Sequence, residues 1–331
     1  MIRTVYQRSR VSVLATVCAL GVAIGFQAPA SAATYTAVPN YSDTDGGLTS
    51  LLGINNAGWL TGSAYYGSNA TGLVRNAAGT YTTFSVNNFT QGRAISETNV
   101  VSGYANDGTN FSTGTEFVRA ADGTLTTLHN PVGGANIHGI AQGMNASGAI
   151  VGDYFVSPTT RHGYLFQGGV LTDLLLPGLD VTRARGITNA GDIAGWTTGP
   201  LGIRGFVLSG GNYSFYTVPV AGALGTTFED LNNFGIAVGN YSDAGGNSHG
   251  FFYDTNTSIF TELHVAGATT IQAFGINDHG QIILSTNLAT GPRNFIYDPN
   301  GVPEPATWAM LLMGFTGLGV ALRRRRALAT A

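Results

Sequence analysis

The chain repeats one short pattern six times, and this repeat restricts its fold more than any other feature. Each copy ends one apolar strand, makes a turn rich in Asn and Gly, and begins a second apolar strand. The copies are GINNAGWLTG from Gly53, AISETNVVSG from Ala94, GMNASGAIVG from Gly143, GITNAGDIAG from Gly186, DLNNFGIAVG from Asp230 and GINDHGQIIL from Gly275. Their starts lie 41, 49, 43, 44 and 45 residues apart. The middle of the chain is therefore an array of similar units.

Each period has room for four short strands. A copy continues with an apolar run such as HGYLFQ at His162 or HGFFYD at His249, and then with an alternating run such as VLTDL or FYTVP. These runs are rich in β-branched and aromatic residues, and residues 34–301 show no convincing helical stripe. Four antiparallel strands in roughly 40 to 50 residues are typical of a propeller blade. The sequence predicts an all-β, six-bladed β-propeller, with an open solenoid of β-units as the competing fold.

The two ends of the repeat array predict how the ring closes. The last copy stops after its third strand, at residues 293–301, and has no fourth. The segment Thr34–Pro39, TYTAVP, resembles the fourth strand FYTVP at Phe215–Pro219. We therefore predict that the N-terminal strand completes the last blade and covers a sheet edge that would otherwise invite aggregation.

The charge of the chain argues against a nucleic-acid partner. The 331 residues carry a formal charge of −3, and only 10% of them are charged. Every basic residue is Arg, and residues 34–301 contain 8 Arg against 17 Asp and Glu, which leaves about −9 in the body. Phosphate binding needs clustered cations. The body is thus predicted to bind no nucleic acid.

The first 32 residues have the pattern of a secretory signal peptide. An Arg-bearing start leads into an apolar run from Val11 to Phe26, and small residues follow at Ala30-Ser31-Ala32. Cleavage there would start the mature chain near Ala33; a retained membrane anchor is the alternative. The single cysteine, Cys18, lies in this segment, so the mature protein is predicted to have no disulfide and no thiolate metal site.

The C-terminal segment 302–326 joins three features in order. Pro303-Glu304-Pro305 precedes an apolar run over 306–322, and Arg323, Arg324, Arg325 and Arg326 follow it. The run is long enough for a short transmembrane helix, and the arginines predict a cytoplasmic tail at 327–331. This arrangement resembles the PEP-CTERM sorting signal of Gram-negative bacteria. The resemblance implies processing by an exosortase in organisms that make exopolysaccharide, with these Pro, Glu and Arg residues as recognition residues. A simple tail anchor is the alternative.

The repeats between residues 33 and 301 also resemble the HAF repeats of extracellular bacterial proteins. The family pattern is Gly-Ile-Asn-x-x-Gly, then an apolar pair with Gly, then His-Ala-Phe. Here Gly replaces Ala at His162-Gly163-Tyr164 and His249-Gly250-Phe251. The resemblance implies an extracellular repeat protein and no defined chemistry.

The residues that could carry catalysis or bind a metal are better explained by structural roles. We expect His162 and His249 to serve the blades, and Asn55, Asn145, Asn232 and Asn277 to bond turn backbone. The loops at 43–47 and 243–247 hold Asp and Asn beside Gly, which could bind Ca²⁺, but solvated turns are preferred. No nucleophile motif or metal-ligand spacing is present, so no catalytic residue, metal or cofactor is predicted. A spatial pair of carboxylates for glycoside cleavage stays open.

A ligand face is predicted where the variable loops between second and third strands gather. Aromatic residues stand at the entries of these loops, and their rings beside Asn and Asp suit sugars or protein edges. The candidates are Tyr65, Tyr66, Tyr104, Tyr154, Phe155, Trp196 and Tyr241. Packing of these rings between blades is the alternative. The sequence thus predicts an exported, non-catalytic binding or structural protein of the cell surface or polysaccharide matrix. A polysaccharide hydrolase or lyase on the same scaffold is the alternative, and a mere spacer for the anchor is a third possibility.

Overall fold

The computed structural model describes residues 33–41, 48–108, 114–128, 139–157, 159–176, 178–179, 181–289 and 293–301. These residues form 24 strands and no helix, and all of them belong to the compact unit Ser31–Ala331. The predicted signal peptide and the whole segment from 302 onward lie outside the described residues. The all-β prediction is confirmed for the part that the structure describes.

The strands form antiparallel four-stranded units, numbered here from 1 to 6 along the chain, and single parallel bridges, Ala70 with Phe89 and Arg161 with Val181, join units 1 and 2 and units 3 and 4 into eight-stranded sheets. Units 1 to 3 are β2(Leu48–Ile54), β3(Leu60–Tyr66), β4(Asn69–Arg75) and β5(Tyr81–Phe84); β6(Phe89–Ile95), β7(Val101–Asn106), β8(Thr115–Arg119) and β9(Leu125–Leu128); and β10(Gly139–Met144), β11(Ile150–Phe155), β12(Arg161–Gln167) and β13(Val170–Leu174). Units 4 and 5 are β14(Val181–Ile187), β15(Ile193–Gly199), β16(Gly202–Ser209) and β17(Asn212–Tyr216); and β18(Leu224–Leu231), β19(Ile236–Ser242), β20(Ser248–Asp254) and β21(Ile259–Glu262). Unit 6 is β22(Ile271–Ile276), β23(Ile282–Thr286), β24(Asn294–Asp298) and β1(Thr34–Val38).

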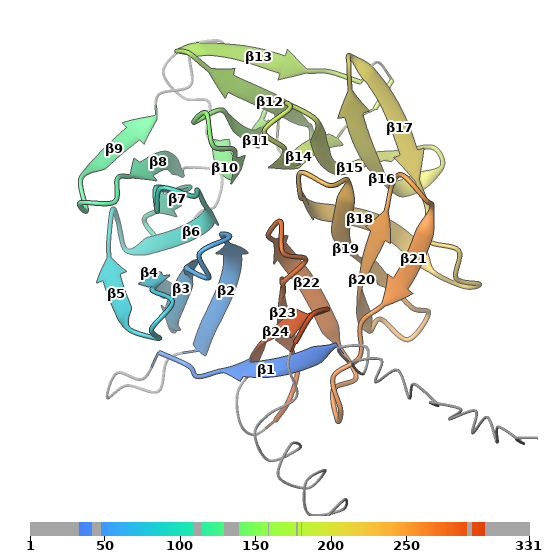
Figure 1. Ribbon diagram of the computed structural model, residues 1–331. Coiled ribbons are helices and arrows are strands. Elements are labelled where there is room, and N and C mark those ends of the chain that lie inside the picture. Colours follow the sequence, from blue (N-terminus) through green and yellow to red (C-terminus); the bar gives the residue numbers. More distant parts are fainter. Residues whose placement is uncertain are drawn as a thin grey trace, which may run out of the picture. The chain divides into compact units, whose positions relative to one another are not determined.

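The first strand of the chain closes the last unit, as the sequence predicts. β1 pairs antiparallel with β24, with Thr34 opposite Asp298 and Val38 opposite Asn294. Val38 is only 2% exposed, and it packs with Ile283 of the same unit and Leu51 of unit 1. Figure 1 shows β1 lying along the outer edge of this unit, where the two ends of the repeat array meet.

The hydrophobic core is shared between neighbouring units. Ala194 and Val207 of unit 4 cluster with Phe228 and Phe251 of unit 5. In the same way, Val238 of unit 5 packs against the buried strands of unit 6. The first strand of each unit lies on the inside of the ring, around a common axis (Figure 1). Because a single unit cannot bury its own faces, stability comes mainly from packing between units.

A glycine in the second strand is required by this packing. In unit 4, a Cβ at Gly195 would overlap the carbonyl oxygen of Arg183 on β14 and the ring of Phe206 on β16. The bare backbone lets the fully buried Phe206 ring lie across the middle of the unit. Gly62, Gly103, Gly152 and Gly239 stand at the same place in other units, which explains the Gly that ends most copies of the repeat.

Candidate functional site

A β-bulge at one fixed place in every inner strand turns a side chain toward the ring axis. The register with the second strand shifts between Gly92 and Ala94, for example, and between Ala184 and Gly186. Such an extra residue re-aims its side chain. The residues at this position in the six units are Leu52, Arg93, Gln142, Arg185, Glu229 and Phe274, and all six line one cavity of about 100 Å³. We call the space that they surround the channel.

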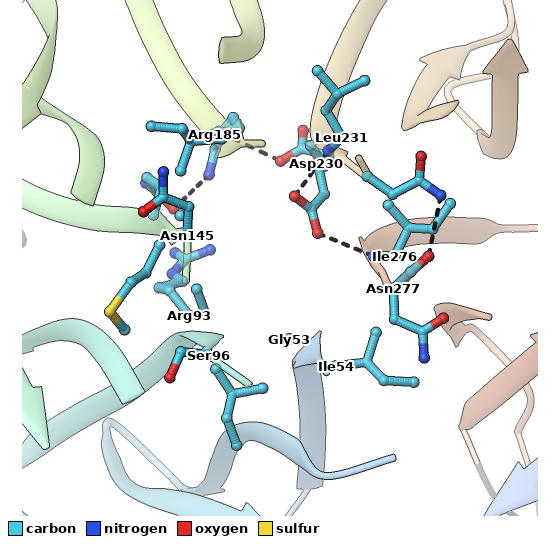
Figure 2. Close-up of a pocket in the computed structure, with 18 of the residues that line it drawn as sticks. Gly53, Ile54, Arg93, Ser96, Asn145, Arg185, Asp230, Leu231, Ile276 and Asn277 are labelled. Carbon is cyan, nitrogen blue, oxygen red and sulfur yellow. Dashed lines mark hydrogen bonds and ion pairs between the residues drawn. The ribbon is translucent and has the colours of Figure 1, made fainter. Parts of the chain in front are cut away.

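Charged residues from different units meet in the channel. Nη1 of Arg185 donates to Oε1 of Gln142 at 2.9 Å, and its Nε lies 3.4 Å from Oε2 of Glu229. Arg93 lies opposite, with its guanidinium over the ring of Tyr104 at 5.7 Å. Figure 2 shows Arg93 and Arg185 projecting inward from separate strands. Burial lowers the pKa of Arg185 to about 10, so the group still carries its charge at neutral pH.

A buried carboxylate holds the charge network together behind the channel. Asp153 on β11 is fully buried, and its Oδ2 accepts from Nη1 of Arg161 at 2.7 Å. Its Oδ1 lies 3.2 Å from Nε of Arg183 and accepts from Nε2 of Gln142 at 3.1 Å. Burial acts to raise the pKa of Asp153, but the surrounding arginines outweigh it and the pKa is lowered. This aspartate is therefore a fixed anion that orients the channel residue Gln142 and two arginines behind the channel.

One guanidinium group of the channel keeps an unused donor. The Nε atom of Arg93 is buried and has no hydrogen-bond partner, whereas Nε of Arg185 faces Oε2 of Glu229 at 3.4 Å. Among the described residues, no carboxylate lies within ion-pair distance of Arg93, whereas Arg185 is near only Glu229. A buried cation without an anion is costly. Arg93 thus presents to the channel a donor that no carboxylate of the described residues uses.

Asp230 departs from the repeat and has an unusual environment. The other copies carry Gly or Ala at this place, and Asp230 is directly beside Gly186 of the preceding unit. Its carboxylate oxygens accept from the backbone N–H groups of Leu231 at 2.8 Å and Ile276 at 3.0 Å (Figure 2). Burial raises its pKa to about 7, against the effect of these hydrogen bonds. A carboxyl group with such a pKa in a cavity is a functional-site candidate.

The raised pKa of Asp230 predicts a pH dependence of stability. The folded protein holds this proton at pH values where the unfolded chain has already released it. The free energy of unfolding should therefore fall as pH rises from about 4 to about 7, with a slope of up to about 1.4 kcal/mol per pH unit from this group. Chemical denaturation at several pH values should show a shallower fall for Asp230→Asn than for the natural protein.

A control separates this effect from general changes in charge. Asp122 is exposed, and the hydrogen bond from Thr124 lowers its pKa, so it acts only below about pH 4. Asp122→Asn should follow the natural profile above pH 5. Glu116 has a pKa of about 7 through burial, and it contributes equally to all three proteins. Parallel profiles for Asp230→Asn and the natural protein would refute the assignment.

The repeated Asn residues hold the turns and also link the units. Oδ1 of Asn232 accepts from the Ile236 N–H of its own turn at 3.0 Å, as the sequence predicts. Its Nδ2 also donates to the carbonyl of Asn277 in the next unit at 3.1 Å, and Asn277 donates to the carbonyl of Asn55 at 3.0 Å. Asn145 makes the same bond to Thr188. The motif therefore carries contacts between units that the sequence analysis did not predict.

A second set of hydrogen bonds, mostly exposed to solvent, joins the same turns at this end of the ring. In five of the six turns, a backbone N–H donates to the side chain at the same place in the next unit. The links are Asn56 to Glu97, Ala146 to Asn189, Asn189 to Asn233, Asn233 to Asp278 and Asp278 to Asn56. Ala146 has no acceptor, which leaves the step from unit 2 to unit 3 without this bond. These links give the turn end of the channel a polar rim that is interrupted between units 2 and 3.

The aromatic candidates of the sequence analysis are mostly packed inside. Tyr104 and Tyr154 are each 2% exposed, and Tyr241 is 5% exposed. Tyr65 is half-buried against Phe89, with ring centroids 5.8 Å apart, and Tyr66 is also half-buried. The remaining two rings each lie under a guanidinium group. The guanidinium carbon of Arg183 is 4.9 Å from the Trp196 ring centroid, and that of Arg161 is 3.6 Å from the Phe155 ring centroid. Only Tyr241 of this set lines a described cavity at the loop end of the channel.

The two histidines of the repeat each join a tyrosine and a carboxylate. His249 stacks on Tyr241 with centroids 4.8 Å apart, and its Nδ1 lies 2.9 Å from Oε1 of Glu262. Its Nε2 lies 3.1 Å from Oδ2 of Asp243. Burial acts to lower the pKa of His249, but the two carboxylates outweigh it and raise the pKa. His162 lies 3.2 Å from Asp173 in unit 3. These groups tie strands within one unit together.

Of the two loops considered for Ca²⁺, only 243–247 is among the described residues. Residues 43–47 lie outside the described residues. In the other loop, the Asp243 carboxylate accepts from the backbone N–H of Asn247 at 2.9 Å and from its Nδ2 at 3.0 Å. Among the described residues, no group of three or more His, Cys, Asp or Glu side chains is placed to hold a metal ion.

The C-terminal candidates lie outside the described residues, but their sequence matches a known signal. Residues 301–326 match the PEP-CTERM protein-sorting motif, which contains Pro303, Glu304, Pro305 and Arg323 to Arg326. The motif marks an exported protein that is processed by an exosortase and anchored transiently in the membrane through its C-terminus. In the described part of the chain, no helix has the length and apolarity to span a membrane. The predicted helix over 306–322 is not part of it.

Solved structures share the fold at low sequence identity. TolB from Acinetobacter baumannii superposes with a TM-score of 0.52 and 10% identity over 72% of this chain, and this chain spans 63% of that TolB chain. A putative TolB from Agrobacterium tumefaciens gives 0.51 and 11%, over 66% and 81% of the two chains. The β-propeller domain of the trilobed protease from Pyrococcus furiosus gives 0.48 and 10%, over 78% and 82%. The TolB likenesses show a propeller-like all-β fold. No curated protein matches the sequence.

Proposed function

We propose that this chain is a six-bladed β-propeller that acts, after export, as a non-catalytic binding protein of the cell surface or extracellular polysaccharide matrix. The observation that carries the proposal is the channel. Its bulged positions bring Arg93, Arg185 and Glu229 together from three units, and Arg93 keeps a buried donor without a partner. A fold needs no such charges for its own packing, since Leu52 and Phe274 serve the same position in other units.

The processing signal supports the location. An exosortase would release the body from its transient anchor on the outer side of the membrane, so the channel would face material outside the cell. Exopolysaccharide is the polymer that the sorting signal suggests. The proposed partners are the exosortase and the polymer, and they do not include a nucleic acid.

The arrangement of carboxylates supports binding rather than catalysis. Glu229 lies beside Arg185, and Asp153 is shared by two arginines. Glu116 accepts from the hydroxyl of Tyr164 at 2.7 Å and is 4% exposed. Glycoside cleavage uses two carboxyl groups that face each other across the bond to be cut. Each of these three carboxylates instead pairs with a side chain of the protein itself.

A hydrolase or lyase is the second candidate, and Asp230 is the observation that favours it. Its pKa of about 7 would suit a general acid at neutral pH. Both of its oxygens already accept backbone hydrogen bonds, however, which favours a structural role for this carboxyl group over proton transfer to a substrate.

One experiment separates the two functions. The processed protein recovered from the cells is incubated with the exopolysaccharide of the same organism, and the polymer is then sedimented and analysed. We expect the protein to be retained on the polymer, with no oligosaccharide released. Release of oligosaccharide that Asp230→Asn abolishes would establish the enzyme instead. Neither retention nor release would contradict both functions.

A further inference from the structure

The channel has a second, larger cavity at the end opposite the Asn turns. It measures about 330 Å³, which is within the usual range for small-ligand sites. Arg93, Arg185, Glu229 and Phe274 belong to both cavities, so they form the common floor. The walls come from the third strand of unit 4, the first three strands of unit 5 and the first strand of unit 6.

The floor of this cavity carries an excess of positive charge. Arg93 and Arg185 supply two guanidinium groups, and Glu229 is the one carboxylate among the described residues that line it. Glu229 is 3.4 Å from Arg185, and among the described residues no carboxylate lies within ion-pair distance of Arg93. The buried Nε atom of Arg93 also has no hydrogen-bond partner. A carboxylate at this point would accept from donors that the protein leaves free.

The walls offer neutral hydrogen-bonding groups. Ser242 at the end of β19 and Ser248 at the start of β20 are half-buried, and Gln272 on β22 is exposed. Their side chains make no hydrogen bond within the described residues. Closely spaced hydroxyl and amide groups match the hydroxyl groups of a sugar ring.

The rim of the cavity is aliphatic. Ile203 is 39% exposed and Leu224 is 60% exposed, although both border the cavity. Gly225 has a φ of 76°, and a Cβ there would lie 3.1 Å from the Ile203 side chain. Ile203 therefore lies against the backbone next to Leu224, and both residues line the mouth. Such a surface can cover the C–H face of a sugar ring.

We propose that this cavity binds a hexuronic acid residue of an acidic polysaccharide. The carboxylate lies against Arg93 and Arg185, the ring hydroxyls face Ser242, Ser248 and Gln272, and the apolar face lies against Ile203 and Leu224. The inference rests on the proposed binding function and adds the class of ligand. A neutral sugar would leave the unpaired arginine buried without an anion, and this cost gives the selectivity.

The test measures binding of trigalacturonic acid to the processed protein by calorimetry. Its fully methyl-esterified form has the same rings without charge, and sodium sulfate tests for anion binding alone. We expect the acid to bind and both the ester and sulfate to bind at least about tenfold more weakly. Arg93→Gln should weaken binding of the acid about tenfold or more and remove most of the preference for the acid over the ester.

Arg75→Gln is the matched control. Arg75 lies over the ring of Tyr81 at 5.7 Å, away from the residues of the channel, and its Nε is also buried without a partner. This variant should bind the acid like the natural protein, and circular dichroism should show that both variants are folded. Equal binding of acid and ester, or no effect of Arg93→Gln, would overturn the ligand class. Sulfate binding that matches the acid would reduce the site to a general anion site and overturn it too. If neither trisaccharide binds while the host polymer retains the protein, only this inference fails; loss of retention would refute the binding function itself.

Discussion

Asp153→Ala is expected to lower the free energy of unfolding by about 3 to 5 kcal/mol. The carboxylate is fully buried and lies 2.7 Å from Arg161 and 3.2 Å from Arg183. Its removal leaves two guanidinium groups without their anion and takes the acceptor from Gln142. The arginine side chains are 21% and 17% exposed, so water relieves part of the cost and favours the lower end of the range. Urea denaturation followed by tryptophan fluorescence measures the change.

A second variant shows whether charge or shape causes the loss. The triple change Asp153→Leu, Arg161→Met and Arg183→Met removes all three charges together and should recover most of the stability. Asp122→Ala, at an exposed position, should cost less than about 1 kcal/mol. If Asp153→Ala were as stable as the natural protein, the network would be a surface feature and not a buried support of the channel.

The repeat pattern predicts the described strands because local sequence and long-range packing agree. Each copy places β-branched and aromatic residues in short runs, and Gly58, Gly148, Gly191, Gly235 and Gly280 adopt positive φ in the turns between them. In unit 2, Asn99 takes this conformation with a φ of 61°. The similarity of TYTAVP to FYTVP predicts the partner of β1 although FYTVP only overlaps the end of a fourth strand: β17 stops at Tyr216, and residues 217–219 lie beyond it.

The ligand face was harder to predict, because strand register decides where a side chain points. Tyr154 and Tyr241 stand opposite the histidines His162 and His249, whereas Tyr104 stands opposite Glu116, one step away in register. Neighbouring positions on a strand face opposite sides. Tyrosines that look equivalent in the sequence therefore occupy different environments, and all three are buried.

The channel did have a signal in the sequence, one residue before each copy of the repeat. This column reads Leu52, Arg93, Gln142, Arg185, Glu229 and Phe274, with three charged residues in a chain where only 10% of residues are charged. The alternation of an ideal strand does not show that the column faces the axis, because the bulge breaks that alternation. The bond from each Asn to the next unit is hidden for a similar reason, since it depends on the distance between turns of different units.

The closure of the ring by β1 supports every statement about the channel, and an engineered disulfide tests it most directly. Thr36 lies opposite Ile296, and directly opposite residues of antiparallel strands are close enough for a disulfide. The double variant Thr36→Cys and Ile296→Cys, with Cys18 replaced by Ser, should form an intramolecular bond that changes migration on a non-reducing gel. This bond should also stabilise the protein by up to about 5 kcal/mol, because it closes a very long loop.

The register control is Thr36→Cys with Phe295→Cys, one residue out of step. Phe295 pairs with Ala37, so its side chain leaves the sheet on the face opposite to that of Thr36. The account predicts an efficient cross-link for the 36–296 pair and almost none for the 36–295 pair. Failure of the first pair in folded protein, or equal cross-linking of both, would contradict a ring sealed by its own first strand.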